Sequence, residues 1–161
     1  MKPYLIFNLD NIKYGLDPIV VKEIFLLPEL MPLAQTPPDI VGVLNLRGEV
    51  VPVMHLGLRL GKQVSPCHLN SNVIILEEDN LSIGIIVDQV QEVMIIESSQ
   101  IQTQVNYQQI RGDQQASALI QSAFVTGIAN INDEMIVLLN SQGLVREPDI
   151  IADVLNSQKL E

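Results

Sequence analysis

Short apolar runs of strand length recur along the chain, and polar turn residues separate them. Most runs are rich in Val and Ile, the residues that fit a pleated, half-buried sheet. Asp10-Asn11 and Asp79-Asn80 stand between consecutive runs and tolerate positive φ, which predicts two tight hairpins. The runs that we interpret as strands are 4–9, 12–16, 50–56, 73–76, 81–87, 123–128 and 135–139. The pattern predicts an all-β fold.

Three segments have the composition of connectors. Residues 28–38 contain four prolines, and residues 61–71 are polar. Residues 97–122 are rich in Gln and Ser, so we expect a mobile loop there. Near the end, Pro148 precedes the spaced apolar pairs of 150–155, which predicts a short amphipathic helix within residues 146–161.

The chain carries an internal repeat. Gly15 superimposes on Gly84, 69 residues further along, and YLIFNLDNIKYGLDPIVVKEIFLL then aligns with VIILEEDNLSIGIIVDQVQEVMII without a gap. Gly42 superimposes on Gly127, 85 residues further along, and GVLNLRGEVVPVM aligns with GIANINDEMIVLL. The ordered motifs predict a structural duplication. We expect two similar β units of about five strands, enough for a sheet to curl and remove its edges, and the two halves can be intertwined.

Composition limits the partners. The 161 residues suit about one domain, and the net charge of −10 argues against nucleic acid and anionic lipid as partners. The N-terminal MKPYLIFNLD lacks the pattern of a signal peptide, and no apolar run reaches the length of a membrane span, so we expect no direct membrane insertion. The single cysteine fits a reducing compartment and a cytoplasmic protein. Charged residues make up only 17% of the chain, which indicates that partners cover some of its surface.

Catalytic and metal-binding patterns are weak. His55, Cys67 and His68 do not have the spacing of a metal site or of a cysteine nucleophile. Residues 77–79, Glu-Glu-Asp, are interpreted as a solvated hairpin tip rather than a pair of acid and base carboxylates. Phosphate-binding glycine motifs and the GxSxG motif of serine hydrolases do not occur in the sequence. We therefore expect no enzyme and no cofactor.

The stretch NLRGEVVPV, residues 45–53, contains an arginine with no obvious charge partner before an apolar strand. In the second copy, Asn132-Asp133 replaces Arg47-Gly48, so the repeated turn does not require an arginine. Two interpretations stay open for Arg47: it extends into solvent, or it lies at a seam between the β units and binds a partner. Glu23, which recurs as Glu92, either pairs locally or contacts a partner at a rim.

NLRGEVVPV closely resembles the corresponding stretch of the CheW-like domain family, and the resemblance extends through the repeated motifs over roughly residues 3–145. It implies a domain over residues 1–145 of two packed, five-stranded SH3-like β-barrels, with residues 146–161 as a C-terminal helix or tail. It also implies scaffolding in chemotaxis, between a chemoreceptor's cytoplasmic tip and the regulatory domain of a CheA-type histidine kinase.

The resemblance further implies a partner-binding groove between the barrels. The matching positions are Val21, Glu23, Asn45, Arg47, Gly84, Val87 and Val93. Where family members often continue with an Asp and an Arg, this chain has His55-Leu56-Gly57, so a salt bridge there is not available. Two alternatives stay open: a small-ligand-binding β-barrel or minor enzyme, and a family member that serves pilus or gene-regulatory signalling.

Overall fold

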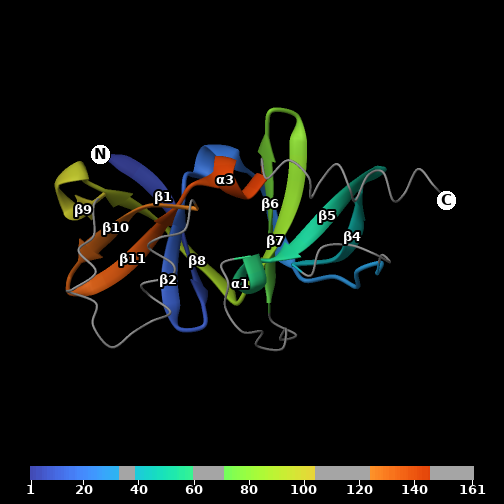
Figure 1. Cartoon of the computed structure of the whole chain (residues 1–161), viewed down its shortest axis with the longest axis horizontal. Coiled ribbons are helices and arrows are strands. Elements are labelled where there is room, and N and C mark those ends of the chain that lie inside the picture. Colours follow the sequence, from blue (N-terminus) through green and yellow to red (C-terminus); the bar gives the residue numbers. More distant parts are fainter. Residues whose placement is uncertain (33–38, 60–70, 104–123, 146–161) are drawn as a thin grey trace.

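The computed structural model describes residues 1–32, 39–59, 71–103 and 124–145. Eleven strands and a few short helices make up these residues, so the predicted all-β class is confirmed (Figure 1). Within the described ranges, none of the helices has the length and apolar character needed to cross a membrane.

The elements follow the repeat. The first copy comprises β1 (Lys2–Leu9), β2 (Ile12–Leu16), the 3-10 helix η1 (Pro18–Val20), β3 (Val21–Leu26), β4 (Ile40–Leu46), β5 (Glu49–His55) and α1 (Leu56–Arg59). The second comprises β6 (Asn72–Glu78), β7 (Leu81–Val87), β8 (Gln89–Ile96), η2 (Ser98–Gln100), β9 (Ile101–Gln102), β10 (Val125–Ile131), β11 (Glu134–Leu139) and α3 (Ser141–Val145).

The strands form two sheets, and each sheet takes strands from both halves of the chain. Sheet A has the order β8-β1-β2-β11-β10-β9, and sheet B has the order β3-β6-β7-β5-β4. The first hairpin of each copy therefore packs with the later strands of the other copy. In sheet B an isolated bridge between Met31 and Val43 occupies the place that β9 has in sheet A. The two sheets are the two intertwined SH3-like barrels, barrel A and barrel B.

In the part of the chain that the structure describes, four hairpins turn through a pair of residues with positive φ. Asp10-Asn11, Asp79-Asn80 and Asn132-Asp133 all have φ between 51° and 65°, as expected for asparagine and aspartate in tight hairpins. Arg47-Gly48 forms the fourth turn. The two predicted hairpins are confirmed, and the equivalence of the fourth turn with Asn132-Asp133 supports the duplication.

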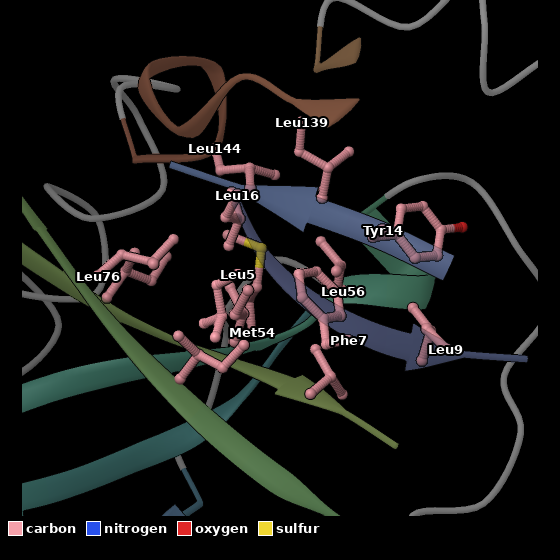
Figure 2. Packing of buried hydrophobic residues seen from close by; sticks show 14 of the residues in the cluster. Leu5, Phe7, Leu9, Tyr14, Leu16, Met54, Leu56, Leu76, Leu139 and Leu144 are labelled. Carbon is pink, nitrogen blue, oxygen red and sulfur yellow. The ribbon is translucent and has the colours of Figure 1, made fainter. Parts of the chain in front are cut away.

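The core has three parts, because the central strands are buried on both faces. Inside barrel B lie Leu44, Val51, Val53, Val73, Ile75 and Ile86; inside barrel A lie Ile6, Ile96, Ala129, Ile136 and Leu138. The third and largest cluster contains side chains from both sheets and fills the seam between them, with Leu5, Phe7, Tyr14, Met54, Leu76 and Leu139 among its members (Figure 2). Adjacent residues of one strand thus serve different clusters: Val53 lies inside barrel B and Met54 in the seam.

Several elements were not among the predicted strands. β3 and β8 were not predicted because many of their residues are exposed, so their apolar runs are interrupted; along β3 half-buried and exposed residues alternate. β4 was also not predicted, although four of its seven residues are buried. The predicted loop 97–122 is wrong at its start, where η2 and β9 form; the rest, from residue 104, lies outside the described residues. The predicted helix within residues 146–161 also lies outside them. Glu77, predicted as part of a solvated tip, forms an ion pair that is described below.

Candidate functional site

The turn between β4 and β5 places Arg47 in an unfavourable backbone conformation. Its φ is 52°, and the equivalent residue of the second copy, Asn132, has a φ of 51°. The left-handed region costs an L-residue about 1–2 kcal/mol, and asparagine is among the few that visit it routinely. An arginine that occupies this position despite the cost is a candidate for a functional role.

Two neighbours hold the arginine in place. Asn45 accepts a hydrogen bond from the backbone N–H of Gly48 at 2.8 Å, which fixes the turn. The guanidinium Nη2 of Arg47 lies 3.0 Å from Oε1 of Glu23 on β3. The ion pair therefore joins the tip of the β4–β5 hairpin to the opposite edge strand of sheet B. Local pairing, one of the two interpretations of Glu23, is confirmed.

The guanidinium remains available to a partner. The side chain of Arg47 is 71% exposed and that of Glu23 is 31% exposed. Arginine has five N–H donors in a planar fork, and the contact with Glu23 engages Nη2 alone. The ion pair of Arg47 lies within sheet B, and the hairpin tip is at the end of β5 that is remote from sheet A (Figure 1).

Lys22 extends this arrangement. It is the bulged residue between Val21 and Glu23, and its ammonium lies 2.8 Å from Glu77 on β6 and 3.7 Å from Glu49 on β5. The hydrogen bond with Glu77 raises the pKa of the Lys22 ammonium above its ordinary value. We call Lys22, Glu23, Arg47, Glu49 and Glu77 the charged network.

An open pocket of about 300 Å³ adjoins the charged network. Its lining combines the ion pair of Lys22 and Glu77 with the apolar residues Ile19, Val20 and Val21. Ile19 is 86% exposed on η1, whose start is capped by a hydrogen bond from the Ile19 N–H to Asp17 Oδ1 at 3.1 Å. The apolar lining of the pocket beside charged groups suits contact with another protein.

The remaining predicted site residues do not join this arrangement. Val87 is fully buried in the seam, and Gly84 is buried inside barrel B, where an added Cβ would lie 3.2–3.3 Å from Val53, Val73 and Ile75. Both residues therefore shape the scaffold beneath the surface. Val93 is 56% exposed, and it lies on β8 at the edge of the other sheet.

The arrangement offers little to a catalytic or metal-binding function. In the described ranges, three or more His, Cys, Asp or Glu residues nowhere gather as metal ligands. His55 is buried and its Nδ1 accepts a hydrogen bond from the Leu58 N–H at 3.4 Å, so it caps α1. Apolar side chains fill the interiors of both barrels, which leaves the small-ligand alternative without support.

Two intertwined barrels that present a partly apolar pocket beside a charged rim have the surface expected of a protein-binding module. The family model for the CheW-like domain matches residues 3–149. The chain belongs to the CheW-like domain family.

Named relatives agree with this assignment. The chain is 29% identical to a chemotaxis protein CheW of Klebsiella aerogenes over 147 residues, which are 91% of this chain and 83% of that protein. It is also 29% identical to a chemotaxis protein CheW of Treponema pallidum over 60% of this chain and 59% of that one. The crystal structure of the scaffolding protein TtCheW from Thermoanaerobacter tengcongensis superimposes with a TM-score of 0.73 at 32% identity, covering 86% of this chain and 88% of that one.

Proposed function

We propose that this chain is a chemotaxis adaptor that couples chemoreceptors to a CheA-type histidine kinase and has no catalytic activity of its own. The observation that carries the proposal is the family match, which spans both barrels. Relatives named chemotaxis protein CheW and a solved scaffolding protein of the same fold support it. The adaptor works in the cytoplasm, where receptor arrays present their signalling tips.

The receptor's cytoplasmic tip binds at the pocket beside the charged network. An apolar side chain of the tip enters the pocket against Ile19, Val20 and Val21, and a carboxylate or carbonyl group of the tip accepts hydrogen bonds from Arg47. Asn45 and Glu23 act as positioning residues, because they hold the turn and the guanidinium. Burial of exposed apolar surface supplies most of the affinity, and the charged groups supply specificity.

The regulatory domain of the kinase binds to a separate surface, so that one adaptor can hold both partners at once. Joining receptor and kinase raises the effective concentration of each for the other. A small movement of the receptor then shifts the populations of kinase conformations. Gly84 and Val87 contribute indirectly, because their packing sets the positions of β7 and the strands beside it.

Co-purification from the native cell tests the function as a whole. We expect the tagged chain to recover a chemoreceptor and a CheA-type kinase, and an Ile19→Asp variant to lose the receptor while it keeps the kinase. Val41→Asp is the control, because Val41 is another exposed β-branched apolar residue of barrel B, 37% exposed, but lies outside the pocket. Recovery of neither partner by the folded wild-type chain would refute the proposal.

A further inference from the structure

The chain passes from one barrel to the other at two equivalent places in the repeat. The first crossing, residues 17–20, joins β2 of sheet A to β3 of sheet B and contains η1. The second crossing is Asp88, which joins β7 of sheet B to β8 of sheet A. With the repeat offset of 69 residues, Ile19 stands where the second copy has Asp88, and Pro3 stands where it has Asn72. The two crossings therefore differ in side-chain chemistry.

The second crossing is fastened to both barrels. Oδ2 of Asp88 accepts a hydrogen bond from the backbone N–H of Asp10 at 2.9 Å, and the N–H of Asp88 donates to the carbonyl of Asn8 at 3.0 Å, which ties the crossing to barrel A. The N–H of Val90 donates to Oδ1 of Asn72 on β6 at 2.9 Å, which ties the start of β8 to barrel B. Both side-chain acceptors make their hydrogen bonds in partly buried surroundings, where such bonds are stronger than in water.

The first crossing lacks these fasteners. The two side chains that stand in the equivalent places, isoleucine and proline, cannot accept a hydrogen bond. The hydrogen bonds described for this crossing are local: the N–H of Ile19 donates to Oδ1 of Asp17 at 3.1 Å, and the N–H of Val20 donates to the carbonyl of Asp17 at 3.3 Å. The N–H of Val21 closes the segment on the carbonyl of Pro18. Within the described residues, these bonds hold η1 to itself and leave it untied to barrel A.

Opening of the first crossing disturbs little of the core. η1 contains no buried residue, and of its residues only Val20 packs against the seam cluster, where it is partly buried. The seam cluster joins the two sheets and holds the barrels together whether or not η1 is formed. Segments with few buried apolar contacts and with exposed backbone hydrogen bonds open at the lowest free energy. The structure thus combines a fixed crossing and a crossing that can open alone.

We propose that η1 is a strap that opens and closes on its own, and that Asp17 is the positioning residue that favours the closed state. The closed strap supplies Ile19 and Val20 to the pocket beside the charged network, so the pocket is complete only while the strap is closed. A partner that fills the pocket therefore binds the closed state better and raises its population. This last step rests on the proposed receptor site, whereas the local opening does not.

Native-state hydrogen exchange of the full chain tests the strap. We expect the amides of residues 19–21 to exchange through local opening, at a rate that low concentrations of urea leave unchanged. The fastened amides should have protection factors at least about tenfold higher, and their exchange should accelerate as urea is added; they are those of Asp10, Asp88 and Val90.

Substitutions of Asp17 test its role. Asp17→Ala removes the side-chain acceptor, whereas Asp17→Asn keeps an oxygen that caps a helix equally well. Asp17→Ala should lower the protection of the Val20 and Val21 amides about fivefold, and Asp17→Asn should restore it. These two amides carry the test because they do not donate to that side chain. Asp88→Ala is the matched control at the other crossing, and it should leave the protection of both amides unchanged.

Addition of the receptor tip tests the coupling to the pocket. At a free tip concentration about ten times its dissociation constant, the protection of residues 19–21 should rise about tenfold. Binding of the tip without this rise would refute the coupling and leave the receptor site standing. Failure of the tip to bind would refute the receptor site, and the exchange of the free chain would still decide whether the strap opens.

Two results in the free chain would overturn the proposal. Equal protection and equal urea dependence at the two crossings would show that η1 opens only together with the rest of the fold. Faster exchange of the Ile19 amide alone in Asp17→Ala would reduce Asp17 to the acceptor of one hydrogen bond, with no control over the strap.

Discussion

Replacing Arg47 with asparagine should separate the stability of this protein from its binding. Arg47 has a φ of 52°, a conformation that asparagine adopts with little strain, so Arg47→Asn relieves about 1 kcal/mol of backbone cost. The same change removes an exposed ion pair with Glu23, which is worth about 0.2–1 kcal/mol. The free energy of unfolding should therefore stay the same or rise by up to about 1 kcal/mol.

Glu23→Gln is the matched control, because it removes the ion pair and leaves the strained arginine in place. Its free energy of unfolding should fall by about 0.2–1 kcal/mol. Glu23→Gln should therefore lower the free energy of unfolding, whereas Arg47→Asn should leave it unchanged or raise it. The double variant Arg47→Asn/Glu23→Gln should show a coupling of no more than about 1 kcal/mol between the two residues.

Urea unfolding followed by circular dichroism measures these differences, since the chain has no tryptophan for fluorescence. Binding to the receptor tip is measured on the same samples, and Arg47→Asn should lower the affinity about tenfold. A loss of more than about 1 kcal/mol of stability in Arg47→Asn would refute the reasoning, because the arginine would then serve the fold. Unchanged affinity in that variant would remove Arg47 from the binding site.

Three further predictions concern the interior. Burial, with a smaller contribution from Asp10, raises the pKa of the Tyr14 hydroxyl. Above about pH 10 the unfolded state therefore ionises first, and the free energy of unfolding should fall as the pH rises. Urea titrations at several pH values should show a smaller decline for Tyr14→Phe. Met54→Ala should lower the free energy of unfolding by about 2–5 kcal/mol and leave a single calorimetric transition, because Met54 lies in the cluster that both sheets share. Met135, which is 61% exposed, is the control: Met135→Ala should change the free energy of unfolding by no more than about 0.5 kcal/mol. Gly84→Val should lower the free energy of unfolding by at least about 1–3 kcal/mol, since an added Cβ already lies within 3.3 Å of three side chains; a normal urea midpoint would contradict this account of the glycine.

Part of the candidate site was predictable from the sequence. The comparison of the two copies singled out Arg47, because the second copy has the residue that the turn prefers. Glu23 was singled out by its recurrence, but its contact with Arg47 could not be read from the pattern, since β3 and β4 are at opposite ends of the strand order of sheet B. Of the residues that line the pocket, only Val21 was among the predicted site residues. Ile19 stands among other apolar residues, and only the tertiary structure separates an exposed isoleucine from a buried one.

The sequence by itself determined the all-β class, the tight hairpins and the duplication. These depend on local properties: β-branched runs, residues that accept positive φ, and motifs repeated in order. The exchange of hairpins between the two halves was decided by the tertiary structure. β1 is antiparallel to both β2 and β8, so the strand in the position of β8 runs parallel to β2. If β3 took that position, the chain would have to connect the parallel strands β2 and β3 within one sheet. A connection between parallel strands needs a dozen or more residues. Only residues 17–20 lie between β2 and β3, so β3 crosses to the other sheet. By the repeat, β8 crosses in the same way and lies beside β1. The seam between the two barrels therefore becomes the largest part of the core.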